Sequence, residues 1–73
     1  MATTIGLRIH SLRKSKGITQ EELAGLLHVG KSTISQYETG RRVPSDETKI
    51  VLAGIFNVSV DYLIFGEDFK KNN

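Results

Sequence analysis

The chain has no cysteine and no tryptophan, and it contains one proline and one methionine among its 73 residues. The lack of cysteine excludes disulfides and thiolate-bound metals. No apolar run approaches the roughly 20 residues that span a bilayer, and the N-terminus lacks the segments of a secretory signal peptide. We therefore predict a cytoplasmic protein without membrane contact, metal or cofactor, stabilised by packing with or without oligomerisation.

Catalytic motifs are also missing from the sequence. His10 and His28 lie on different predicted elements and have no paired carboxylate motif. There is no His-Glu-x-x-His motif, no glycine-rich phosphate loop and no nucleophile elbow. Glu47 and Asp61 fall in first helical turns, where the helix dipole favours acidic side chains. The sequence predicts that the protein is not an enzyme.

The net charge is only +2, but the charges are unevenly distributed. Residues 1–44 carry seven basic and three acidic side chains, whereas residues 45–73 carry three basic and five acidic ones. The N-terminal part therefore suits a polyanion such as nucleic acid. A solvated basic face with no partner is the alternative explanation.

Hydrophobic periodicity and capping residues predict five helices and no strand, and therefore an all-α fold. Residues 1–66 form one domain in this prediction, and residues 67–73 form a polar tail. The expected helices cover about residues 4–16, 19–27, 31–39, 46–56 and 60–65.

The predicted helix ends rest on specific residue types. Thr19 and Glu22 have the spacing of a capping box, which predicts a helix start there. His28 and Asn57 each follow a helix at a point where a sharp turn needs positive φ, and both residue types tolerate it better than most. After His28, Val29 is expected to point into the core.

The expected core takes one apolar stripe from each helix. Ile34 and Tyr37 are the inward residues of the third helix. Ile50, Ala53 and Phe56 are the expected inward stripe of the fourth.

The second and third helices, separated by a tight turn, have the layout of a DNA-reading helix-turn-helix. Such a motif places the N-terminal residues of its second helix against base edges in the major groove. The outer face of residues 31–39 carries small or extended polar side chains that can pair with bases: Lys31, Ser32, Ser35 and Gln36. A purely structural helix can show a similar polar face.

Residues flanking this helix are candidates for contacts with the DNA backbone. Gln20 lies in the first turn of the second helix, where amide groups can hold a phosphate. Thr33 lies at the edge of the outer face of residues 31–39. Thr39, Arg41 and Arg42 follow this helix, in a loop that can lie on the DNA backbone. The alternative for each is solvated surface, and for Arg42 taken singly that explanation is about as good.

Taken together, these segments resemble the phage repressor and Cro-type (Xre-type) helix-turn-helix family. The resemblance covers about residues 5 to 66. It is carried by Ile9-x-x-Leu12-Arg13, Gly17-Ile-Thr-Gln-Glu-Glu-Leu-Ala24, Ser32-Thr-Ile-Ser-Gln-Tyr-Glu38, Gly40-Arg-Arg-Val-Pro44 and Val58-Ser-Val-Asp-Tyr-Leu63.

The resemblance implies a compact five-helix, lambda-repressor-like domain that binds palindromic double-stranded DNA as a homodimer. It assigns base reading to Lys31, Ser32 and Gln36, and with less support to Ser35. It also implies an ion pair between Arg13 and Glu38, for which the alternative is an Arg13 side chain with its charge in water.

Two residues depart from the family pattern. His28 replaces the usual glycine of the turn, and Gly30 replaces the usual Ser or Thr cap. Both residue types fit these positions physically, although they can loosen the start of the third helix.

Large apolar residues near the C-terminus suggest the dimer surface: Tyr62, Ile64, Phe65 and Phe69. The leading interpretation is a transcriptional repressor. The alternatives are the antitoxin of a toxin–antitoxin pair, which binds a protein as well as DNA, and a protein-interaction module that uses the same fold.

Overall fold

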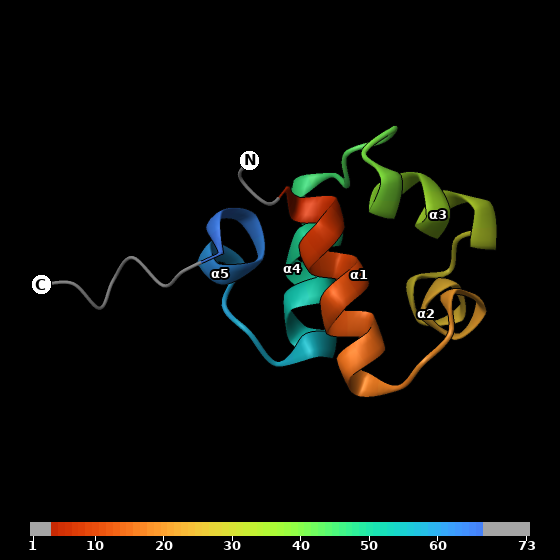
Figure 1. The fold of residues 1–73 in the computed structure, drawn as a ribbon, viewed down its shortest axis with the longest axis horizontal. Coiled ribbons are helices and arrows are strands. Elements are labelled where there is room, and N and C mark those ends of the chain that lie inside the picture. The colour runs from red at the N-terminus through yellow and green to blue at the C-terminus, as the bar shows by residue number, and fades with distance from the viewer. Residues whose placement is uncertain (1–3, 67–73) are drawn as a thin grey trace, which may run out of the picture.

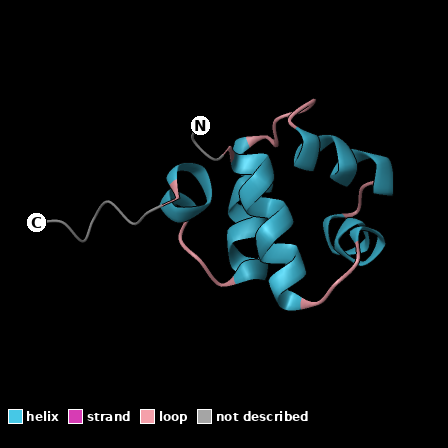
Figure 2. Cartoon of the chain, in the orientation of Figure 1, coloured by secondary structure: helices cyan, strands magenta, loops and turns pink. Residues whose placement is uncertain are grey.

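A computed structural model describes residues 4–66, and within this range it contains helices and loops but no strand (Figure 2). The helices are α1 (Ile5–Lys16), α2 (Gln20–Leu27), α3 (Lys31–Thr39), α4 (Asp46–Phe56) and α5 (Val60–Phe65). They agree closely with the ranges predicted from the sequence. The predicted tail and Phe69 lie outside the described residues.

Helices α1 and α4 lie side by side at the centre of the domain, with α5 on one side and α2 and α3 on the other (Figure 1). Helix α3 packs against both α1 and α2. This arrangement leaves the outer side of α3 at the edge of the molecule, while α5 lies at the opposite end.

Local capping chemistry fixes where the helices begin. Thr19 accepts a hydrogen bond from the Glu22 amide, and the Glu22 carboxylate accepts one from the Thr19 amide, so the predicted capping box is present. Ser45 and Ser59 cap α4 and α5 through their hydroxyl groups, which accept hydrogen bonds from the Thr48 and Tyr62 amides. Each cap satisfies a backbone donor that the helix itself leaves unpaired.

Left-handed residues end the helices, and they include both non-glycine residues that the sequence predicted. His28 has φ 59° and Asn57 has φ 58°. At both positions the chain turns sharply enough to start the next helix three residues later. The substitution of His28 for the family's glycine is therefore accommodated without a change of fold.

The centre of the core takes one fully buried aliphatic side chain from every helix. Partly buried apolar residues pack around this cluster. The five central residues are Ile9, Leu23, Ile34, Leu52 and Leu63.

Two predicted core positions are wrong. Val29 is 36% exposed, and Ile50 is 61% exposed. On α4 the inward side chains are Leu52, Ala53 and Phe56. Ala53 and Phe56 are buried as predicted, but Leu52 takes the place given to Ile50. Apolar residues surround most of this helix, so its periodicity does not identify one inward face.

Gly6 sets the distance between α1 and α3. A Cβ atom added there would lie 2.3 Å from the Tyr37 carbonyl oxygen, which is far inside van der Waals contact. Only glycine permits this approach, and the sequence analysis did not single it out.

Candidate nucleic-acid interface

The outer surface of α3 and the first turn of α2 enclose a groove of about 640 Å³. Its walls bring together all four predicted base-reading residues and three of the five predicted backbone residues. The lining residues are Gln20, Lys31, Ser32, Ser35, Gln36, Thr39 and Arg41. Thr33 and Arg42 do not line the groove.

The two faces of α3 are clearly divided. Ile34 and Tyr37 are buried, while Lys31 and Ser32 are exposed and Gln36 is half-buried. The buried residues fix the rotation of the helix and leave Lys31 and Ser32 facing outward, with Gln36 partly exposed on the same side. The start of α3 is capped by Gly30, which has no side chain to bond to the helix.

The chain after α3 folds back onto the end of that helix. The amides of Arg41 and Arg42 both donate to the Gln36 carbonyl, and the Thr39 hydroxyl lies 3.0 Å from the Ser35 carbonyl. These bonds hold Arg41 beside the groove. Arg42 is also exposed but stands outside it.

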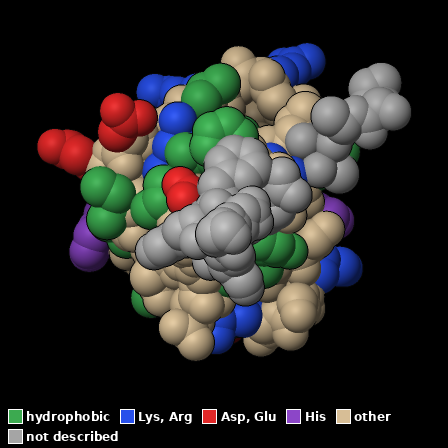
Figure 3. All heavy atoms as spheres, turned by 90° about the vertical axis from the view of Figure 1, so that its left-hand side faces the viewer, with side chains coloured by type: hydrophobic (Ala, Val, Ile, Leu, Met, Phe, Trp, Pro, Cys, Tyr) green, Lys and Arg blue, Asp and Glu red, His purple; other side chains and the backbone are tan. Residues whose placement is uncertain are grey.

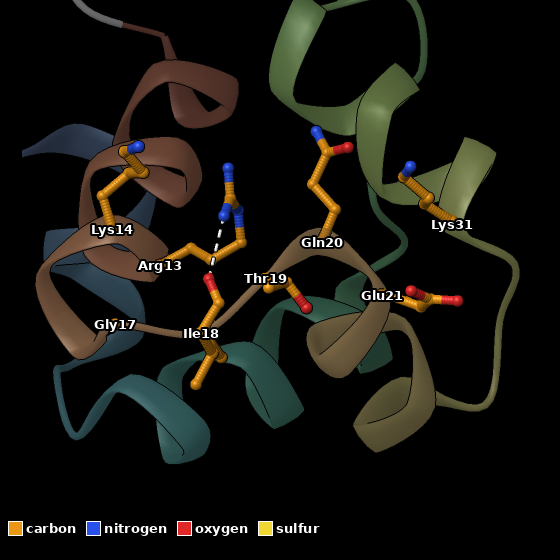
Figure 4. A pocket seen from close by; sticks show the side chains of 8 residues that line it. All are labelled: Arg13, Lys14, Gly17, Ile18, Thr19, Gln20, Glu21 and Lys31. Atoms are coloured by element: carbon orange, nitrogen blue, oxygen red, sulfur yellow. Dashed lines mark hydrogen bonds between the residues drawn. The ribbon is translucent and has the colours of Figure 1, made fainter.

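The predicted ion pair is present and buried. Arg13 Nε donates to Glu38 Oε2 at 2.7 Å, with both side chains less than a tenth exposed. A second Arg13 nitrogen donates to the Ile18 carbonyl at 2.9 Å. The guanidinium therefore joins α1 to the end of α3 and to the loop before α2; Figure 4 shows its bond to the loop.

Two further side chains converge on the same carboxylate. Gln20 Nε2 donates to Glu38 Oε1 at 3.0 Å, and His10 Nδ1 lies 3.0 Å from the same oxygen. Gln20 was predicted only as a backbone contact, and the sequence showed no carboxylate partner for His10. Since 28 residues separate His10 from Glu38, no local motif marks this contact.

These contacts determine the protonation state of Glu38. Burial raises the pKa of the Glu38 carboxyl, but hydrogen bonds to Arg13, His10 and Gln20 lower it, as does the charge of Arg13. The pKa is lowered overall from its ordinary value. Glu38 is therefore a carboxylate at neutral pH, in the form that accepts all these hydrogen bonds.

Arg8 is a structural residue that the sequence analysis missed. Its Nε donates to the Leu63 carbonyl at 2.8 Å and its Nη2 to the Ile64 carbonyl, so it binds the end of α5. A signal was available: Ile5, Arg8, Ile9 and Leu12 follow the i, i+3, i+4, i+7 pattern of an inward helical face. An arginine in that stripe indicates a buried guanidinium with carbonyl or carboxylate partners.

Within residues 4–66 there is no group of His, Asp and Glu residues arranged to hold a metal ion. The same part of the chain contains no helix long and apolar enough to cross a membrane.

The fold and this polar groove define a helix-turn-helix domain, and comparison with known proteins gives the same family. The helix-turn-helix family model matches residues 9–63, so the chain belongs to the helix-turn-helix family, in its Cro/C1-type branch. The resemblance seen in the sequence is therefore confirmed.

Individual relatives agree with this assignment. The transcriptional regulator ImmR of Bacillus subtilis is 36% identical over 70 residues, covering 96% of this chain and 55% of ImmR. Antitoxin PezA of Streptococcus pneumoniae is 42% identical over 69 residues, covering 93% of this chain and 42% of PezA. The chain thus spans about half the length of these curated relatives.

A solved structure matches the whole fold. The P22 c2 repressor, crystallised in complex with a synthetic operator, superposes with a TM-score of 0.85 and 32% identity. The match covers 90% of this chain and all of that one. The lambda-repressor-like fold is therefore confirmed, and the family is one of transcriptional regulators and not of enzymes.

Proposed function

We propose that this chain binds double-stranded DNA sequence-specifically and represses transcription, with α3 inserted in the major groove. One observation carries the proposal: the predicted base-reading residues and three backbone-binding residues, from α2, α3 and the following loop, line a single groove. The P22 c2 repressor in its operator complex has the same fold, which supports this use of the surface. Such a function places the protein in the cytoplasm with the DNA.

In this proposal the first turns of α3 read the bases. Lys31 donates to guanine O6 and N7, and Gln36 pairs with adenine N6 and N7. Ser32 and Ser35 are short enough to let the helix backbone approach the bases closely and can donate or accept. All four side chains line the groove, and those of Lys31 and Ser32 are exposed, which supports these roles.

The surrounding residues position the protein on the phosphates without reading sequence. Arg41 lies on the groove wall and has no carboxylate partner among the ion pairs of residues 4–66. Thr39 and Gln20 line the same groove. Thr33 and Arg42 stand outside it and serve as flanking contacts.

We further propose that the protein acts as a homodimer on a palindromic operator. Tyr62 is 37% exposed and Phe65 is 55% exposed, and hydrophobic side chains gather on the side of the molecule that carries α5 (Figure 3). Exposed apolar surface of this kind favours association. Binding to successive major grooves on one side of the duplex would require the two α3 helices of this dimer to lie about one turn of DNA, ~34 Å, apart.

Sequential selection from a pool of random duplexes tests the function. The parent is expected to enrich a palindrome with half-sites about one helical turn apart. A reporter gene placed behind the selected site is expected to be silenced when the protein is produced. No enrichment from a folded parent protein would contradict autonomous sequence-specific recognition.

An antitoxin is the second candidate, favoured by the 42% identity to PezA. In that case the chain binds a toxin protein in addition to DNA. Co-expression with the product of the adjacent gene distinguishes the two functions, since an antitoxin is expected to form a stable complex that neutralises a toxic partner. A regulator without this role is expected to purify alone.

A further inference from the structure

A second hollow, of about 610 Å³, lies between the end of α1 and the start of α2. We propose that Lys14, on its outer wall, binds a phosphate of the DNA backbone and extends the contact surface from α2 and α3 onto α1. This inference rests on the proposed DNA-binding function. It assigns a role to a residue that lies outside the helix-turn-helix itself.

The position of the hollow carries the first part of the argument. Gln20 and Lys31 line both this hollow and the groove beside α3. The two depressions are therefore neighbouring parts of one surface. A duplex whose major groove receives α3 has phosphates on both edges of that groove, and the next backbone passes over the start of α2.

The side chains of the hollow point in a consistent direction. Lys14 stands on one side of the hollow and Lys31 on the other, with Gln20 between them, and their side-chain nitrogens lie on the same side of the first turn of α2 (Figure 4). Glu21 also lines the hollow, but its carboxylate points away from Lys14. The side that faces Lys14 is thus rich in nitrogen donors.

The charges of the hollow single out Lys14. Arg13 also lines it, but its guanidinium is bound to the buried Glu38 carboxylate and to the Ile18 carbonyl. Among the residues that the structure describes, Lys14 and Lys31 take part in no ion pair. Lys14 is therefore an exposed cation that forms no ion pair with any residue of the range 4–66, and a phosphate is a ligand with complementary charge.

Lys16 provides a matched control. It lies in the same last turn of α1 and is also exposed, but it does not line the hollow. Removing either charge changes the net charge of the protein equally, so a non-specific electrostatic effect would appear in both variants. Only a phosphate contact at the hollow predicts a difference between them.

The test measures binding of a fluorescent duplex of random sequence over a series of salt concentrations. The logarithm of affinity falls linearly with the logarithm of salt, with a slope of about −0.9 for each neutralised phosphate. Lys14→Ala is expected to reduce the slope by about 0.9 for each bound subunit, while Lys16→Ala leaves it unchanged. The base consensus selected by Lys14→Ala is expected to match that of the parent, because phosphate contacts carry no sequence information.

The possible outcomes separate a failure of the Lys14 assignment from a failure of the proposed DNA-binding function. Equal slopes for the parent and Lys14→Ala overturn the assignment of Lys14 and leave the proposed function intact, as does an equal reduction in both lysine variants. A parent protein that does not bind the duplex even at low salt overturns the proposed function, and the Lys14 assignment with it. Melting curves of both variants are expected to match that of the parent, because both substituted side chains are exposed.

Discussion

At the scale of single residues, Glu38 connects the fold to the candidate interface. Its carboxylate accepts hydrogen bonds from Arg13 of α1 and Gln20 of α2 while its backbone belongs to α3. The same carboxylate therefore fixes α3 relative to α1 and orients a residue of the groove wall. A change at this one position is expected to alter both stability and DNA binding.

The pH dependence of stability tests this role. Folding lowers the pKa of Glu38, so its contribution to the unfolding free energy is complete above the ordinary value of about 4.5 and is lost as pH falls through the lower, folded pKa. Each pH unit by which folding lowers the pKa corresponds to about 1.4 kcal/mol. Urea unfolding at a series of pH values is expected to show a steeper acid loss in the parent than in Glu38→Gln.

The chain carries other carboxylates besides Glu38, and for this reason the difference between the two proteins is the quantity to compare. Identical pH profiles, offset only by a constant, would contradict the role given to the Glu38 carboxylate.

At the scale of elements, the predictions that rested on local chemistry were correct. The capping box at Thr19 and the left-handed residues His28 and Asn57 depend on contacts within a few residues, so the sequence is enough to identify them. The ion pair between Arg13 and Glu38 was implied by the family resemblance, and its geometry bears this out.

Predictions that required knowledge of packing were less successful. Ile50 was placed inward because α4 is apolar around most of its circumference, and only the position of the neighbouring helices shows that Leu52 faces the core. The contact between His10 and Glu38 joins residues far apart in the sequence. Whether the groove residues contact DNA stays a prediction.

The approach of α1 to α3 yields a test with an internal control. Gly6→Ala is expected to destabilise the domain, because its Cβ would meet the backbone of Tyr37 and Glu38, which cannot move aside as a side chain can. Gly54→Ala on α4 meets nothing within 4 Å and is expected to stabilise by roughly 0.5–1 kcal/mol through helix propensity. Urea unfolding measures both.

The comparison with Gly54→Ala separates the effect of close packing from that of helix propensity. A stabilising or neutral effect of Gly6→Ala, similar to that of Gly54→Ala, would contradict the close packing of α1 on α3.

At the scale of the whole molecule, the groove beside α3 and the apolar residues of α5 lie at opposite ends of the domain. In the proposed dimer the α5 ends meet at the two-fold axis and the two grooves face the same side of the duplex. The α5 surface would then set the spacing of the half-sites, while the groove beside α3 reads them.

Replacing Phe65 tests the proposed dimer surface. Phe65→Glu is expected to shift the protein toward monomer in sedimentation, because a charged side chain opposes burial against a second copy. Leu26→Glu is the matched control, since Leu26 on α2 is 54% exposed and Phe65 is 55% exposed. An unchanged mass for Phe65→Glu, or an equal shift in both variants, would contradict an interface at α5.

The most direct test of the central claim, that α3 reads bases while its flanks hold the backbone, compares Gln36→Ala with Arg41→Ala. Both variants are titrated against the selected operator and against operators changed at single base pairs. Gln36→Ala is expected to lose about 1–3 kcal/mol of discrimination at one position, and Arg41→Ala to weaken binding to all sequences uniformly and reduce the salt slope by about one. Uniform weakening by Gln36→Ala, with discrimination retained at every position, would contradict base reading by α3.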